Sequence, residues 1–130
     1  MTDKTEFLIE TDILADHLSS DNNSEDTVLE TAMQRGTCFT TVLNASELYF
    51  AASTEEENIA VDKLLKALKI LGLNSRYSLS IFGLNRTLKN IRDSLIYVTA
   101  KINKLPIITA DIKKYGKTDI KIIHPKELRG

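Results

Sequence analysis

Apolar positions along the chain fall into short runs and into helical spacings. A short apolar run bounded by polar residues predicts a β-strand, and apolar residues that recur every three or four positions predict a helix. The runs predict strands over residues 7–9, 38–43, 106–109 and 121–123. The spacings predict helices over residues 13–18, 26–35, 44–52, 54–71, 75–88 and 92–103.

This order of elements predicts an α/β fold with a mostly parallel central sheet and helices on both faces. Strands that are separated by helices pair in parallel through right-handed crossovers, and the helices then cover the sheet. A chain of 130 residues is expected to form a single domain over residues 1–130, because a second core would be marginal in size. In such a sheet, ligands bind beyond the carboxyl ends of the strands.

Several predicted helix ends carry capping residues. Gly36 directly follows a predicted helix, where a left-handed cap is common. The spacings from Asn44 to Glu47 and from Thr54 to Glu57 are those of capping boxes, in which two side chains satisfy amides at a helix start. We therefore expect helices to begin at these two positions.

The composition is that of an ordinary globular protein, with 42% hydrophobic and 27% charged residues, which excludes a mainly disordered chain. The single Cys38 cannot close an intramolecular disulfide, and one cysteine is too few for a cysteine-based zinc site. Residues 1–6 lack the pattern of a signal peptide, and no apolar stretch reaches the roughly 20 residues that span a bilayer. We therefore expect a cytoplasmic protein with no membrane partner.

Charge is divided unevenly between the two halves of the chain. Residues 1–62 carry 14 acidic and two basic side chains, whereas residues 63–130 carry 15 basic and four acidic ones. This asymmetry is typical of a protein that binds a polyanion or a charged partner, although a fold that interleaves the two halves would also produce it.

Acidic residues recur where the predicted strands end. Glu10 and Asp12 follow the first strand, Glu47 lies in the first helical turn after the second, and Asp111 follows the third. Asp93 opens the helix before the third strand, and a helix that runs antiparallel to the strands begins at the same sheet edge. Clustered carboxylates repel one another unless a cation lies among them, and all-oxygen ligation favours Mg²⁺ or Mn²⁺ over zinc.

Each of these acids also has a purely structural interpretation. Glu47 could complete a capping box with Asn44, Asp93 could favour the positive end of a helix dipole, and Asp12 could cap the helix that follows it. Glu10 is harder to explain in this way. A carboxylate that continues an apolar strand into the interior costs several kcal/mol unless it is paired, protonated or metal-bound.

Four short motifs occur in an order and spacing that match a known family. They are FLIETDIL over residues 7–14, TTVLNASEL over residues 40–48, DSLIYVTA over residues 93–100 and IITAD over residues 107–111. With these motifs the chain resembles the PIN-domain ribonucleases, and most closely the small VapC-type toxins of toxin–antitoxin pairs. The resemblance covers residues 7–125. One position departs from it, because the family has Asp where this chain has Glu10.

The resemblance implies a ribonuclease that hydrolyses RNA phosphodiester bonds with Mg²⁺ or Mn²⁺ as cofactor. It assigns catalytic and metal-binding roles to Glu10, Glu47, Asp93 and Asp111, with Asp12 as a further candidate ligand in the place of the family's Asn or Ser. Thr11 and Thr109 lie beside these acids in the sequence, and their hydroxyl groups could anchor a carboxylate or the scissile phosphate, or they could be ordinary threonines at strand ends. The implied partners are RNA, a cognate antitoxin protein and a second copy of the chain in a homodimer. The apolar stripe of the helix over residues 54–71 could contact a partner or belong to the core.

An acidic site repels RNA, so basic residues are expected to hold the substrate around it. The candidate phosphate contacts precede Asp93 or follow Asp111 closely in the sequence; they are Arg86, Lys89, Arg92, Lys113 and Lys114. The lysines at 63, 66 and 69 have a similar spacing, but they are better explained as a solvated helix face.

Two other functions remain open for this sequence. The chain could be a catalytically impaired PIN-fold module that binds RNA or protein, because Glu10 extends its carboxylate one methylene farther than Asp would. It could also be an RNA-processing nuclease that is not a toxin.

Overall fold

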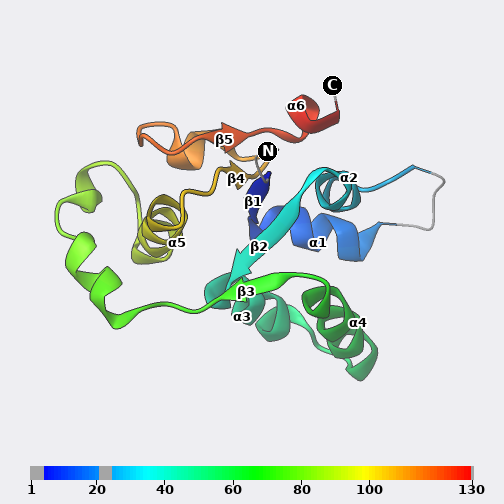
Figure 1. The fold of residues 1–130 in the computed structure, drawn as a ribbon. Coiled ribbons are helices and arrows are strands. Elements are labelled where there is room, and N and C mark those ends of the chain that lie inside the picture. Colours follow the sequence, from blue (N-terminus) through cyan, green and yellow to red (C-terminus); the bar gives the residue numbers. More distant parts are fainter. Residues whose placement is uncertain (1–4, 21–24, 130) are drawn as a thin grey trace.

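The computed structural model describes residues 5–20 and 25–129, and a five-stranded sheet lies at its centre (Figure 1). The strands are β1 (Glu6–Ile9), β2 (Thr37–Thr41), β3 (Lys69–Leu71), β4 (Ile107–Ile108) and β5 (Ile122–Ile123). Their order in the sheet is β3-β2-β1-β4-β5, and every neighbouring pair is parallel. The predicted α/β fold with a parallel sheet is confirmed.

Helices connect the strands. They are α1 (Thr11–Ser19), α2 (Val28–Arg35), α3 (Val42–Ala51), α4 (Glu55–Lys66), α5 (Ile91–Ile102) and α6 (Pro125–Arg129), together with the 3₁₀ segments η1 (Ser75–Ser80), η2 (Leu84–Arg86) and η3 (Ile112–Tyr115). The sequence pattern did not predict α6. None of the helices that the structure describes is long and apolar enough to cross a membrane.

The alternation of side chains along β1 divides the core into two layers. Phe7 and Ile9 pack on one face of the sheet with residues of α1, α2, α3 and α4, while Leu8 packs on the other with α5 and the 3₁₀ segments. In β4, Ile108 and Ile107 divide in the same way. Figure 1 shows α1 and α2 beside one face and α5 beside the other. Helices therefore cover both faces, as expected.

The second strand is shorter than the prediction over residues 38–43, because Thr41 ends it. The Thr41 hydroxyl accepts hydrogen bonds from the amides of Leu43 (3.1 Å) and Asn44 (3.3 Å), and Asn44 Oδ1 accepts one from the Thr41 amide at 3.0 Å. Thr41 and Asn44 thus form the capping box of α3, and the predicted box from Asn44 to Glu47 is wrong. As a result, the Glu47 side chain has no capping role.

The predicted helix over residues 54–71 ends early, and a strand follows it. The helix α4 ends at Lys66, and β3 pairs with β2 through Lys69–Leu71. An edge strand of three residues whose first two side chains are exposed carries no alternation that a sequence could reveal. Residues 75–88 contain two 3₁₀ segments instead of the predicted helix. Gly83, between them, has a φ of 86°, a left-handed conformation that a continuous α-helix does not allow.

Gly36 follows α2 in an extended conformation with a φ of −175°, so the predicted left-handed cap is wrong. The position requires glycine for a different reason, because a Cβ there would lie 2.3 Å from the carbonyl oxygen of Thr5. The Thr37 amide donates a hydrogen bond to the same carbonyl at 2.9 Å. Gly36 therefore permits the close approach of the chains that begin β1 and β2.

Gly36→Ala is expected to lower the free energy of unfolding by about 1–3 kcal/mol, because the new methyl group forces these two chains apart. Urea denaturation followed by circular dichroism measures the change. Gly72→Ala is the matched control, since nothing lies within 4 Å of a Cβ at that position. Equal stability of the two variants would contradict the role assigned to Gly36.

Candidate active site

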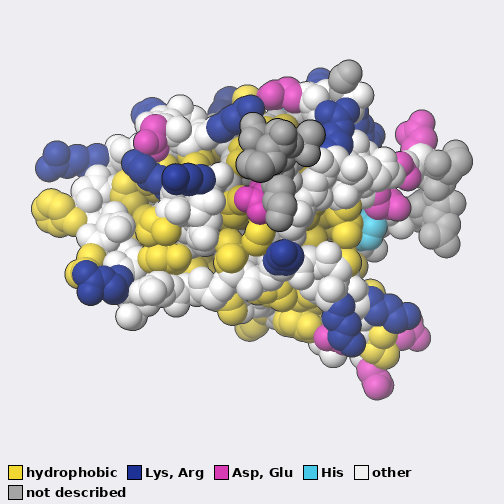
Figure 2. Space-filling model, in the orientation of Figure 1, with side chains coloured by type: hydrophobic (Ala, Val, Ile, Leu, Met, Phe, Trp, Pro, Cys, Tyr) yellow, Lys and Arg dark blue, Asp and Glu magenta, His cyan; other side chains and the backbone are white. Residues whose placement is uncertain are grey.

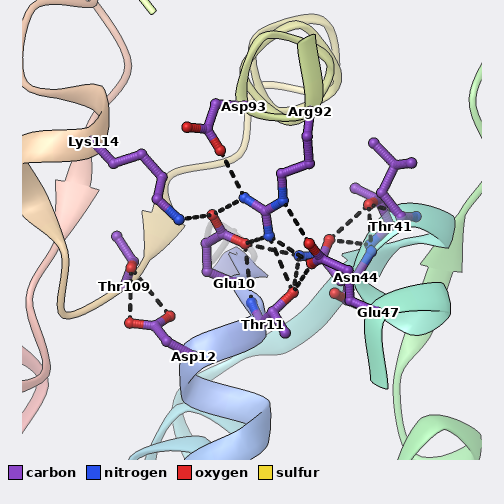
Figure 3. Close-up of polar contacts among 12 residues, drawn as sticks. Glu10, Thr11, Asp12, Thr41, Asn44, Glu47, Arg92, Asp93, Thr109 and Lys114 are labelled. Atoms are coloured by element: carbon purple, nitrogen blue, oxygen red, sulfur yellow. Dashed lines mark hydrogen bonds and ion pairs between the residues drawn. The ribbon is translucent and has the colours of Figure 1, made fainter. Parts of the chain in front are cut away.

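Glu10 lies at the carboxyl end of β1, the central strand of the sheet, within the polar cluster shown in Figure 3. The chain passes from β1 into α1 without a loop, and Glu10 is the N-cap of α1, because its Oε1 accepts a hydrogen bond from the Thr11 amide at 3.0 Å. The Glu10 side chain is only 1% exposed. A carboxylate buried to this extent needs partners for both of its oxygens.

Neutral side chains hold both oxygens of the Glu10 carboxylate. Asn44 Nδ2, in the first turn of α3, donates to Oε1 at 2.9 Å, and the Tyr115 hydroxyl, in η3, donates to Oε2 at 2.7 Å. Asn44 and Tyr115 are themselves fully buried. Because Asn44 Oδ1 also accepts a hydrogen bond from the Thr41 hydroxyl at 2.6 Å, the cap of α3 and the Glu10 carboxylate share one side chain.

The guanidinium of Arg92 lies among three carboxylates (Figure 3). It binds both oxygens of Glu10 through Nη1 (2.6 Å) and Nη2 (2.5 Å), and both oxygens of Glu47 through Nε (3.0 Å) and Nη2 (2.8 Å). Its Nη1 also lies 3.0 Å from Asp93 Oδ1. The elements β1, α3 and α5 thus bring three of the four expected catalytic acids around one positive charge.

This arrangement sets the charge states in the cluster. Burial alone would raise the pKa of Glu10, but the hydrogen bonds and the charge of Arg92 outweigh it and lower that pKa to about 2. Burial also opposes ionisation of Glu47, yet hydrogen bonds from Arg92 and Thr11 lower its pKa. The pKa of Tyr115 is raised, first by burial and then by the nearby charge of Glu10. At neutral pH both glutamates are ionised, and the Tyr115 hydroxyl is a hydrogen-bond donor.

The two threonines that were expected to support the acids both take part in the network. Thr11 Oγ1 donates to Glu47 Oε1 at 2.6 Å, which ties the start of α1 to α3. Thr109 Oγ1 and the Ala110 amide donate to Asp12 Oδ2 at 3.0 and 2.9 Å. Asp12 therefore fastens the first turn of α1 to the end of β4, and the N-cap of α1 is Glu10 rather than Asp12.

Asp111 lies at the same edge of the sheet but outside the carboxylate cluster. It directly precedes η3, its side chain is exposed, and its amide donates to Thr109 Oγ1 at 3.2 Å. The ion pairs formed by the described residues do not include Asp111. Among the described residues, the carboxylates that pair with Arg92 are therefore those of Glu10, Glu47 and Asp93, and Asp111 is not one of them.

Basic side chains line a cavity of about 350 Å³ beside the acidic cluster. The five come from the segment before α5 and from the segment around η3; they are Arg86, Lys89, Lys113, Lys114 and Lys117. Lys114 joins the cavity to the cluster, since its Nζ lies 3.5 Å from Glu10 Oε2. In the part of the chain that the structure describes, no acidic side chain lines this cavity. Four of the five expected phosphate contacts therefore lie together, and the fifth, Arg92, faces the acids instead.

The cluster suits a divalent metal ion in the kind of its ligands, because Glu10, Glu47 and Asp93 offer only oxygen atoms. Its arrangement does not suit one, because the Arg92 guanidinium lies where these oxygens meet. Among residues 5–20 and 25–129, no three His, Cys, Asp or Glu side chains are grouped so as to hold a metal ion. In this arrangement the cation that lies among the three carboxylates is the Arg92 guanidinium itself.

Sequence reasoning missed three features of this site. The spacing from Thr41 to Asn44 is that of a capping box and could have identified Asn44. The Tyr115 hydroxyl meets Glu10 across 105 residues, and no spacing indicates such a contact. Arg92 was expected to contact phosphate, but its guanidinium turns toward Glu10, which lies 82 residues earlier in the chain.

Comparison with known proteins identifies the family. A family model for the PIN domain matches residues 7–120, and the chain therefore belongs to the PIN-domain family. Proteins of this family are typically metal-dependent nucleases. No curated protein matches the chain in sequence.

Solved structures share the fold at low sequence identity. VapBC2 from Rickettsia felis, in a structure with a DNA fragment from its promoter, matches with a TM-score of 0.76 and 17% identity. The match covers 92% of this chain and 98% of that one. DNA-bound VapBC from Salmonella typhimurium matches with a TM-score of 0.75 and 14% identity, over 93% of this chain and 98% of that one. VapBC-1 from nontypeable Haemophilus influenzae matches with a TM-score of 0.73 and 19% identity over 94% and 99%. The resemblance to VapC-type proteins is thus confirmed at the level of the fold.

Asn44→Ala is expected to lower the free energy of unfolding by about 2–3 kcal/mol, because the Thr41 amide and a Glu10 oxygen lose a buried partner. Urea denaturation measures this loss. Asn58→Ala, at an exposed position in α4, is the control and should change stability by no more than about 0.5 kcal/mol. If the two variants unfold alike, Asn44 does not support the cluster.

Proposed function

We propose that the chain is a metal-dependent endoribonuclease and the toxin of a VapBC-type toxin–antitoxin pair. One observation carries the proposal. Three carboxylates, from the end of β1, from α3 and from α5, converge on the Arg92 guanidinium beyond the carboxyl ends of parallel strands. They do so in a chain that belongs to the PIN-domain family. That edge is where ligands bind to sheets of this kind. The proposed location of the protein is the cytoplasm.

The proposed ligands of Mg²⁺ or Mn²⁺ are Glu10, Glu47 and Asp93, from which the Arg92 guanidinium must first withdraw, with Asp111 and Asp12 as further candidates at the same edge. A bound ion would polarise a phosphate oxygen and lower the pKa of a water molecule. The chain's own residues position the ligands: Thr11 holds Glu47, and Thr109 holds Asp12. Asn44 and Tyr115 fix the two oxygens of Glu10, so its carboxylate is preorganised before any ligand binds.

The proposed substrate contacts are the basic side chains of the cavity beside the cluster. Lys114 lies both in this cavity and within 3.5 Å of Glu10, so an RNA backbone that follows the cavity would lead to the acids. Because the lining residues carry positive charge from two separate segments, the cavity suits successive phosphate groups. Lys117, which the sequence did not single out, joins the expected residues there.

The proposed protein partners are an antitoxin and a second copy of the chain. The matched solved structures are toxin–antitoxin complexes, which supports the first of these. An apolar groove of about 300 Å³ between α1, α3 and α4 is lined by Leu18, Leu48 and Val61, among others, and is a suitable surface for an apolar partner segment. Figure 2 shows further hydrophobic side chains at the surface in the region of α3 and α4, and Phe50 of α3 is 94% exposed.

A catalytically impaired module that binds RNA without cleaving it is the second candidate. The observation that favours it is the position of Arg92, which satisfies the acids without a metal ion. A nuclease that processes RNA without acting as a toxin differs from a toxin in its effect on growth, because its expression without an antitoxin would not arrest growth.

Purified protein is expected to cleave structured RNA in Mg²⁺ or Mn²⁺ and to lose this activity in EDTA. Asp93→Asn and Glu47→Gln should each lower the cleavage rate by about 100-fold or more, because each removes a charged ligand. Asp16→Asn, at an exposed position in α1, is the control and should cleave like the wild type. RNA binding without metal-dependent cleavage would favour the binding module instead.

Lys113→Ala/Lys117→Ala is expected to weaken RNA binding and to flatten its dependence on salt. Each lost phosphate contact should reduce the slope of log K against log[salt] by about 0.7 for single-stranded RNA. Fluorescence anisotropy at several salt concentrations measures both quantities. The control, Lys63→Ala/Lys66→Ala on α4, removes the same charge elsewhere; an equal effect of the two pairs would contradict a specific role for the cavity.

A further inference from the structure

Every N–H group of the Arg92 guanidinium has an acceptor in the acidic cluster. Nε donates to Glu47, Nη1 donates to Glu10 and Asp93, and Nη2 donates to Glu10 and Glu47. Two carboxylates are therefore bound through two parallel hydrogen bonds each, which is the strongest pairing that arginine forms with carboxylates. The side chain nevertheless remains 23% exposed, so solvent reaches it.

While Arg92 is bound, both oxygens of the Glu10 carboxylate already accept hydrogen bonds from several donors. Oε1 accepts from the Thr11 amide, Asn44 and Arg92. Oε2 accepts from Arg92 and Tyr115, and Lys114 also lies 3.5 Å from it. A metal ion that bound these oxygens would also lie beside the positive guanidinium, which adds repulsion to the loss of lone pairs.

We infer that Arg92 is an internal cation that competes with divalent metal ions for Glu10 and Glu47, and so sets the metal affinity of the cluster. Metal ions bind only when the guanidinium leaves these carboxylates. The inference rests on the proposed function for the identity of the ligands, but it concerns binding and needs no RNA. It gives Arg92 a role that differs from the phosphate contact expected from its position in the sequence.

The competition is tested by titrating the metal-free full-length protein with Mn²⁺ and following free Mn²⁺ by electron paramagnetic resonance. Arg92→Ala is expected to bind Mn²⁺ at least about tenfold more tightly than the wild type, because the competing cation is gone. Arg76→Ala is the matched control, since it removes the same charge from an exposed position in η1 that belongs to neither the cluster nor the basic cavity. It should change the Kd of Mn²⁺ by less than about threefold.

Thermal unfolding supplies a second readout. Without metal, Arg92→Ala leaves the buried Glu10 without its main counter-charge and should unfold at a lower temperature than the wild type. Added Mn²⁺ should raise its midpoint by more than it raises that of the wild type. If Arg92→Ala does not fold at all, Arg92→Lys is titrated in its place; lysine cannot form the two forked pairs, so tighter Mn²⁺ binding than in the wild type is again expected.

Equal or weaker Mn²⁺ binding by the Arg92 variants than by the wild type would overturn the inference. The result is separable from the proposed function. Tighter Mn²⁺ binding in a protein that never cleaves RNA would support the role of Arg92 and reject the nuclease. Metal-dependent cleavage by a protein whose Mn²⁺ affinity is insensitive to Arg92 would support the nuclease and reject the competition.

Discussion

The pairing of Arg92 with Glu10 and Glu47 is the interaction on which the carboxyl edge of the sheet depends. Glu10 ends the central strand with a side chain that is almost fully buried, and an ionised carboxylate is stable there only beside a positive charge. Loss of one partner from such a buried pair typically costs about 3–5 kcal/mol. Arg92 supplies the charge from α5 and thereby joins β1, α3 and α5 at a place where their backbones do not pair. Any ligand that displaces it must also compensate Glu10.

The parallel topology makes this convergence possible. Each crossover returns the chain to the same edge of the sheet, so residues far apart in the sequence meet beyond the strand ends. Glu10 is bonded to side chains that lie 34, 82 and 105 residues later in the chain. Asn44 belongs to the capping box of α3, Arg92 lies in the first turn of α5, and Tyr115 lies in η3. Each of these segments directly follows or precedes a strand of the sheet. The scaffold therefore gathers the site without any long functional loop.

The fold could be predicted from the sequence wherever local pattern decides the structure. The apolar run over residues 7–9 and the four ordered motifs indicated the parallel sheet and the family, and three of the four expected acids do converge. Local pattern failed at β3, because a short edge strand with exposed side chains has no alternation. It also failed at Gly36, where the constraint is a contact with Thr5 rather than a backbone conformation. The orientation of Arg92 could not be predicted from local pattern. It depends on the charge of the buried Glu10 carboxylate, which lies at the end of β1, far from Arg92 in the sequence.

The length of the side chain at position 10 has a genetic consequence. Glu10 reaches the guanidinium with both oxygens, whereas an aspartate at this position would hold its carboxylate about 1.5 Å farther back along the side chain. Glutamate and aspartate codons differ only in their third base. A single-nucleotide change is therefore enough to draw the carboxylate at position 10 back from the Arg92 guanidinium.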